Sequence, residues 1–213
     1  FSIALLWVVH PLLTQAVTYV VQRSESGMGL CLLASVYASI RGFEASDGRS
    51  RLWSALAVVS CGIGMGTKEV MVVAPIVVWL HDRSFLSGSG PSALRGRPGL
   101  YAGLAACWAI PFGLIGVDAL FFGEMARPDL ETVSRLAYAL TQPAILLHYV
   151  RLALWPHPLV FDYGWPAAER WSDILPPLVV VSAAAAAGAW AVWRNRPWGF
   201  MAAWFFAILA PTS

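Results

Sequence analysis

The chain has 213 residues, of which 58% are hydrophobic and only 12% are charged, with 11 tryptophans and a mean hydropathy of +0.65. Soluble domains carry about 25% charged residues, so this composition excludes an ordinary soluble domain and indicates a polytopic membrane protein. The net charge of +2 is too small to indicate a nucleic-acid partner.

Apolar runs along the chain predict an all-α fold, a polytopic transmembrane helical bundle. A membrane-spanning helix needs about 20 predominantly apolar residues, and about seven runs approach that length. In chain order they are 1–21, 27–40, 52–67, 70–81, 100–117, 174–193 and 198–211.

The run from Leu52 to Leu80 is interrupted only by Lys68 and Glu69. A charge in the middle of a span costs roughly 2.5–3.5 kcal/mol, and one helix over this run would be about 43 Å long against a hydrocarbon core of about 30 Å. We therefore expect two short or tilted passes that meet at Lys68–Glu69. The alternative is that the pair marks a helix end at the membrane surface, where both side chains reach water.

Charge asymmetry supports the two-pass interpretation, because positively charged loops stay on the cytoplasmic side. Two passes place the segments 41–51, 82–98 and 194–196 on one face, which then holds 8 basic and 3 acidic residues. The opposite face holds 6 basic and 9 acidic residues. Residues 118–173 then form one long non-cytoplasmic loop, in which 130–155 is expected to be an interfacial helix.

The same topology places the unusual polar clusters on the non-cytoplasmic face. Lys68 and Arg23 could neutralise a phosphate or pyrophosphate. Three carboxylates could act as general base or orient an acceptor hydroxyl: Glu25, Glu69 and Asp162. Four further polar side chains are candidates for substrate binding: His10, Gln15, His157 and Tyr163.

Each cluster also has a structural interpretation. His10 and Gln15 fit a helix kinked at Pro11, in which polar side chains form hydrogen bonds with the freed backbone acceptors. Arg23 and Glu25 fit a solvated ion pair at a turn, and Asp162 with Tyr163 fits a rigid corner after X-Pro steps. The three cysteines lack the spacing of a zinc site, and the sequence contains no P-loop, GxGxxG, HExxH or GxSxG motif.

Four stretches resemble the integral-membrane glycosyltransferases of the GT-C superfamily, in particular the transmembrane and tetratricopeptide-repeat family of protein O-mannosyltransferases and its bacterial relatives. The matching stretches are His10 to Ser26, Gly64 to Asp82, Leu140 to Tyr163 and Trp204 to Ser213. Their order and separation also match the family. Leu13 and Gln15 stand where the family often has His and Glu.

The resemblance implies a polyprenyl-phosphate-linked sugar as donor, transfer on the non-cytoplasmic face and inversion at the anomeric carbon. Lys68 falls on the family's S/T-K-E motif, where contact with the lipid phosphate is implied. Residues 1–213 are then part of one GT-C-like transmembrane domain. The essential acidic loop is expected before Phe1, and the tetratricopeptide repeats after the last residue.

We therefore predict an enzyme that transfers a mannose-like hexose to an acceptor protein or glycan, at a Ser or Thr hydroxyl in the protein case. It is expected to be an integral multi-pass protein of the bacterial inner membrane, in contact with the lipid bilayer. No metal site is predicted, and a divalent cation cofactor stays open. The alternatives are a multi-pass transporter or lipid flippase, with Lys68–Glu69 as a proton or ion relay, and a catalytically silent scaffold for tetratricopeptide repeats.

Overall fold

A computed structural model describes residues 2–13, 22–45, 48–88, 90–114, 135–160, 163–166, 168 and 170–210. Within these ranges every regular element is helical and none is a β-strand, so the predicted all-α class is confirmed. The chain divides into two units. Unit 1 comprises 1–22, 127–187 and Ser213, and unit 2 comprises 23–126 and 188–212.

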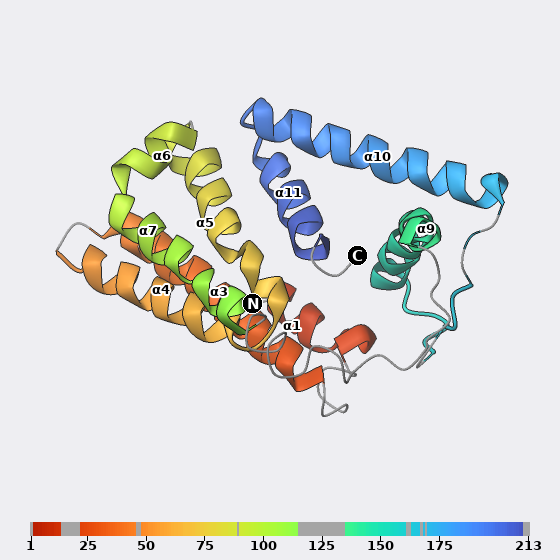
Figure 1. Cartoon of the computed structure of the whole chain (residues 1–213), viewed down its shortest axis with the longest axis horizontal. Helices are drawn as coiled ribbons and strands as arrows, with labels where there is room; N and C mark the ends of the chain where they lie inside the picture. The colour runs from red at the N-terminus through yellow and green to blue at the C-terminus, as the bar shows by residue number, and fades with distance from the viewer. Residues whose placement is uncertain are drawn as a thin grey trace. The chain divides into compact units, whose positions relative to one another are not determined.

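Unit 1 contains short helical segments near the start of the chain and two long helices from its later part (Figure 1). Its elements are α1 (Ser2–Val8), η1 (Pro11–Leu13), α9 (Arg135–Leu154) and α10 (Trp171–Trp193), the last of which continues into unit 2. Helix α9 confirms the predicted helix over 130–155 from Arg135 onward. Residues 130–134 lie outside the described part of the chain.

In unit 2, the helices from α4 to α7 follow one another with few residues between them, and α11 follows α10 (Figure 1). Its elements are α3 (Arg23–Glu44), α4 (Ser50–Met65), η3 (Glu69–Val73), α5 (Ala74–Asp82), η4 (Arg83–Ser87), α6 (Gly90–Gly96), α7 (Pro98–Ala106) and α11 (Pro197–Leu209). Prolines occupy the first turn of α5, α7 and α11, where the ring is preorganised for a helix and no backbone donor is lost.

Helices α3 and α4 form an antiparallel hairpin. The Ser50 hydroxyl donates to the Gly42 carbonyl at 2.9 Å, and the Ser35 hydroxyl donates to the Ala57 carbonyl at 3.0 Å. Residue numbers rise on one helix as they fall on the other, which defines the antiparallel register. A Cβ on Gly42 would lie only 3.2 Å from the Cβ of Trp53, so a small residue allows the two backbones to approach.

Helix α7 runs parallel to α4 and antiparallel to α5. A Cβ on Gly103 would lie 2.7 Å from Val58, and one on Gly62 would lie 3.6 Å from Ile110. Residue numbers therefore rise in the same direction along α4 and along the segment that begins with α7. The Trp108 Nε1–H donates to the Val72 carbonyl at 3.0 Å.

The Tyr101 hydroxyl donates to Asp82 at 2.7 Å. Together with the bond from Trp108 to Val72, it shows that residue numbers on α5 and α7 run in opposite directions. Helix α7 runs parallel to α4 and antiparallel to α5. The chain direction therefore reverses between α4 and α5. The predicted return of the 52–80 run at Lys68 is therefore confirmed as a reversal of chain direction.

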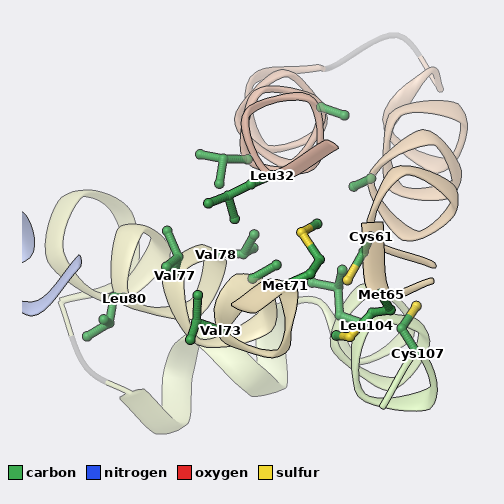
Figure 2. Close-up of a cluster of buried hydrophobic side chains, with 14 of the residues drawn as sticks. Leu32, Cys61, Met65, Met71, Val73, Val77, Val78, Leu80, Leu104 and Cys107 are labelled. Atoms are coloured by element: carbon green, nitrogen blue, oxygen red, sulfur yellow. The ribbon is translucent and has the colours of Figure 1, made fainter. Parts of the chain in front are cut away.

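The core of unit 2 lies where α3, α4, η3, α5 and α7 converge. Figure 2 shows Met71 at the centre of this cluster, with Leu32 of α3, Cys61 and Met65 of α4 and Leu104 of α7 around it. Met71, Cys61 and Leu104 are fully buried. The flexible thioether of a methionine fills irregular gaps between helices, and the cysteines are free thiols that pack as small hydrophobes.

Two described helices are long and apolar enough to cross a membrane: Glu69–Ser87, which comprises η3, α5 and η4, and α10. The sequence predicts about seven membrane segments, and this number is not supported, because only these two helices in the described residues have the length and composition of a span. Three other apolar helices have only 10–17 residues: Ser50–Met65, Pro98–Leu114 and Pro197–Leu209. In the first predicted run, α1 ends at Val8, shortly before Pro11, whose ring cannot continue a helix interior.

Helix α4 nevertheless displays an apolar stripe. Leu52, Leu56, Val59 and Ile63 are all exposed, and their spacing places them on one helix face. Contiguous exposed apolar surface of this kind marks contact with a membrane or a protein partner. Together with the two long apolar helices, the stripe supports membrane association.

The three arginine-rich segments meet at one end of unit 2, as the charge asymmetry predicts. The Arg97 guanidinium lies 4.2 Å from the ring centroid of Phe43, which joins segment 82–98 to segment 41–51. Arg83 donates to the Val192 carbonyl at 3.2 Å, and Asn195 donates to the Gly88 carbonyl at 2.9 Å. These bonds join segment 194–196 to the same end, which we call the arginine end.

Candidate functional site

The break between α4 and η3 is built around the carbonyl of Gly64. This carbonyl accepts hydrogen bonds from the backbone N–H of Thr67 at 2.9 Å, from the Thr67 hydroxyl at 2.7 Å and from the N–H of Lys68 at 3.3 Å. Three donors on one carbonyl close the last turn of α4. Lys68 is then extended, with φ −158° and ψ 145°, so the helical ladder cannot pass through it.

Lys68 pairs with Glu25, a residue 43 positions earlier in the first turn of α3. The ammonium donates to the Glu25 carboxylate, and both side chains are partly buried, with 26% and 33% exposure. A carboxylate is also favoured in the first turn of a helix by the helix dipole. The two partly buried charges of Lys68 and Glu25 therefore compensate each other.

Arg23 and Glu69 are chain neighbours of this pair. Arg23 is the first residue of α3 and Glu69 the first residue of η3, and both side chains are exposed. The structure thus brings four of the predicted site residues to one end of unit 2. We call Arg23, Glu25, Lys68 and Glu69 the Lys68 cluster. It lies at the opposite end of α3 from the arginine end, about 30 Å away at 1.5 Å per helical residue.

His10 has a structural role in unit 1. Its Nδ1 accepts the backbone N–H of Leu12 at 3.3 Å, so its Nε2 carries the proton and donates to the Ala153 carbonyl at 3.1 Å. The imidazole thereby fixes the His10–Pro11 turn to the end of α9. The structural interpretation from the sequence was a helix kinked at Pro11. Instead α1 ends at Val8 and a short 3-10 helix begins at Pro11, while the polar side chain of His10 does bond to backbone groups.

Tyr163 forms a corner in unit 1. Its hydroxyl donates to the Pro158 carbonyl at 2.7 Å and accepts the Val160 N–H at 3.3 Å. The ring packs edge-to-face on His148 at 4.8 Å, while His157 is exposed. Gln15 and Asp162, also predicted as site residues, lie outside the described residues.

Two features were not predicted as site elements from the sequence. His148 lies between Tyr163 and Trp165, with ring centroids at 4.8 and 5.0 Å. Asp82 is fully buried and accepts bonds from Arg97, Tyr101 and the Ser87 hydroxyl. Such an arrangement satisfies a buried carboxylate. No local pattern signals it, because its partners lie 5, 15 and 19 residues away.

An open apolar hollow of about 320 Å³ lies between α5, α6 and α7 of unit 2. Aromatic side chains from two helices, Trp79, Tyr101 and Trp108, form much of its wall. Trp108 also bonds to Val72, four residues after Lys68. The hollow therefore extends along the helices between the level of the Lys68 cluster and the level of Asp82.

No group of three His, Cys, Asp or Glu side chains able to hold a metal ion occurs within the ranges that the structure describes. The chemistry available at the Lys68 cluster is that of an ammonium, a guanidinium and two carboxylates. Ammonium and guanidinium groups form charge-assisted hydrogen bonds with phosphate oxygens, and a carboxylate can accept a proton or orient a hydroxyl.

The chain is similar to Protein O-mannosyl-transferase Tmtc2 of Drosophila melanogaster, with 27% identity over 170 residues. The match covers 78% of this chain but only 18% of the length of the relative. No family model matches the chain, and no solved structure does. The similarity indicates a distant relation to a protein O-mannosyltransferase.

Proposed function

We propose that this chain is part of a membrane glycosyltransferase that moves a mannose-like sugar from a polyprenyl-phosphate donor to an acceptor, a protein Ser or Thr hydroxyl or a glycan. The distant similarity to a protein O-mannosyltransferase supports the reaction class. The observation that carries the proposal is the Lys68–Glu25 pair at the reversal between α4 and α5.

Lys68 is the group we assign to the donor phosphate. An ammonium carries three donors, so the bond to one Glu25 oxygen is compatible with a phosphate oxygen as a second acceptor. Glu25 then acts as a positioning residue, because it directs the flexible lysine stem toward one point. Arg23 is exposed two residues before Glu25 and adds a second positive charge at the same end.

The proposed step is a direct displacement at the anomeric carbon. The acceptor hydroxyl oxygen forms the new bond to this carbon while its proton passes to a carboxylate. The bond between the carbon and the phosphate oxygen breaks, and the lipid phosphate leaves with the electron pair. Preorganised charge from Lys68 and Arg23 stabilises the charge that develops on the leaving group. Glu69, adjacent to Lys68 and exposed, is a carboxylate candidate for the proton.

The same proposal assigns the two ends of unit 2 to opposite sides of the membrane. The arginine end faces the cytoplasm, since basic loops are retained there, and the Lys68 cluster faces the opposite side. The two long apolar helices and the shorter apolar helices lie in the bilayer, and the apolar hollow beside Trp108 lies along α5 and α7. The bacterial inner membrane predicted from the sequence stays a prediction, since the similar protein is from Drosophila.

Substituting Lys68 in the full-length protein tests the proposal. Lys68→Gln removes the charge, and turnover with a polyprenyl-phosphate mannose should fall by about 10²–10³-fold, the loss typical of one transition-state charge donor. Lys68→Arg keeps the charge with a different shape and should retain part of the activity. Unchanged turnover in Lys68→Gln would remove this residue from the mechanism.

A transporter or lipid flippase is the second candidate, and the helix break at Lys68 favours it. Transporters bind substrates and ions at discontinuous helices with charged or polar groups at the break. Reconstituted protein that moves a lipid or ion across vesicles without transferring sugar would support this function. The same vesicles assayed for sugar transfer separate the two candidates.

A further inference from the structure

We propose that the turn between α10 and α11 binds the phosphate headgroups of anionic phospholipids. The turn comprises Arg194, Asn195 and Arg196, and it directly follows Trp193, the last residue of a candidate membrane-spanning helix. A turn at the end of a span lies at the level of the lipid headgroups. This inference does not rest on the proposed glycosyltransferase activity.

The backbone of this turn is fixed by local bonds. Asn195 has a left-handed conformation with φ 51°, which asparagine tolerates better than most residues. Its side chain donates to the Gly88 carbonyl at 2.9 Å, and the Arg196 N–H donates to the Ala191 carbonyl at 2.8 Å. Arg194 and Arg196 are therefore displayed on either side of an anchored residue, and both are exposed.

Three exposed tryptophans lie close in sequence to the two arginines. Trp193 is 74% exposed, and Trp190 and Trp198 are each 48% exposed. The guanidinium of Arg194 lies 5.8 Å from the ring centroid of Trp190 and 5.9 Å from that of Trp193. Tryptophan rings at the end of a membrane helix favour the headgroup level, since one part of the indole is apolar and its N–H is polar.

Arginines outnumber carboxylates at this end, with 8 basic and 3 acidic residues in its three segments. Neither 83–114 nor 174–210 contains an Asp or Glu. In the described part of the arginine end, the two carboxylates are already paired: Glu44 lies 3.6 Å from Arg41, and buried Asp82 is bonded to Arg97. Anionic lipid headgroups supply the complementary charge, because basic residues near a membrane surface attract them individually.

The aromatic–arginine pairing recurs along the arginine end. Arg41 lies 5.7 Å from the ring centroid of Trp53, and Arg83 lies 5.8 Å from that of Trp79. An arginine over a ring keeps its apolar stem on the protein while its charge can reach toward lipid phosphate. The α10–α11 turn is the part of this surface with two exposed arginines and three exposed tryptophans, and we place the lipid there.

The test measures lipids retained by the purified full-length protein in mixed detergent micelles with phosphatidylglycerol or phosphatidylcholine, by native mass spectrometry. Wild type should retain phosphatidylglycerol preferentially. Arg194→Gln with Arg196→Gln should reduce that preference by roughly 25-fold, about fivefold for each arginine. Arg194→Lys with Arg196→Lys, which keeps both charges, should retain most of it.

Arg151→Gln is the matched control, because it removes one exposed arginine in the last turn of α9, away from the arginine end in sequence, and should leave the preference unchanged. Thermal unfolding in phosphatidylcholine shows whether the double variant is folded. If it is misfolded, Trp193→Leu is measured in its place, and retention of phosphatidylglycerol should weaken severalfold.

Three results would overturn the inference. The first is a wild-type preference that persists in the double glutamine variant. The second is an equal loss in Arg151→Gln. The third is displacement of phosphatidylglycerol by inorganic phosphate at matched ionic strength, which would show a site for free phosphate rather than for a lipid headgroup.

Discussion

Nη1 of Arg97 lies 2.9 Å from Oδ2 and 3.1 Å from Oδ1 of Asp82, a carboxylate with no exposed surface. The pair connects the start of α7 to the end of α5, 15 residues apart. Tyr101 and Ser87 complete the shell of donors around the carboxylate. The arginine end of unit 2 is thus organised around one buried anion.

Removing the arginine should expose the cost of burying Asp82. We expect Arg97→Met to lower the free energy of unfolding by roughly 2–4 kcal/mol. This is less than the 3–5 kcal/mol of a fully buried pair, because the Arg97 side chain is 31% exposed. Arg95→Met removes an exposed arginine nearby and is the control. Chemical denaturation in detergent measures both, and equal stability of the two variants would contradict the prediction.

Gly64 should tolerate no side chain. A Cβ there would lie 2.8 Å from Met71 and 2.9 Å from the Cβ of Cys31. Gly64→Ala should therefore destabilise unit 2 by about 1–3 kcal/mol, as overpacking of a close contact does.

Gly29→Ala is the matched control, since Gly29 lies inside α3 with nothing within 4 Å of an added Cβ. It should be neutral or stabilising by up to about 1 kcal/mol, because alanine favours a helix over glycine. Thermal unfolding of the two variants gives the comparison. A Gly64→Ala protein as stable as the Gly29→Ala protein would show that α4 is packed less closely than the structure indicates.

The Lys68–Glu25 pair should matter more for activity than for stability. The two side chains are 26% and 33% exposed, so solvent screening limits the stability loss in Glu25→Gln to about 1 kcal/mol or less. Turnover should fall more strongly, because an unanchored lysine no longer meets the donor phosphate in one geometry.

A double-mutant cycle with Glu25→Gln and Lys68→Gln, followed by both turnover and unfolding, separates these effects. The expected result is strong non-additivity in turnover and weak coupling in stability. Additive losses in turnover would show that the two residues act independently.

Thr141 should hold the segment after Tyr163 against α9. Its hydroxyl donates to the Ala137 carbonyl at 2.7 Å and accepts the Ala168 N–H at 2.9 Å. Thr141→Val keeps the shape but leaves that N–H unpaired, at a cost of about 1–3 kcal/mol where water cannot replace it. Hydrogen exchange at the Ala168 amide should then accelerate, whereas Thr141→Ser should keep its protection.

The sequence predicted the helix break because the signal is local. One lysine and one glutamate interrupt an otherwise uncharged run. Placing them inside a membrane span costs free energy whichever helices pack around that span. The structure places the reversal at that point. The gathering of the arginine segments was predictable for a related reason, since an odd number of passes through 52–80 would separate them.

The candidate site was only partly predictable. The two-pass topology predicted that Lys68 and Glu25 share a face, but their direct pairing depends on how α3 packs against α4. His10 and Tyr163 were predicted as binding residues because they are polar side chains close to prolines. In the structure both form hydrogen bonds to backbone groups. Asp82 was counted only as one charge of a loop, because nothing in its neighbours indicates full burial.

By itself, the sequence determined the helical class, the membrane-like composition and the point at which the chain turns back. These follow from side-chain hydropathy and charge, which act residue by residue along the chain. Only the tertiary structure decided which charges meet. Lys68 reaches Glu25 across 43 residues, and Asn195 reaches Gly88 across 107. Such contacts depend on the register and close approach of packed helices, which glycines such as Gly42 and Gly64 permit.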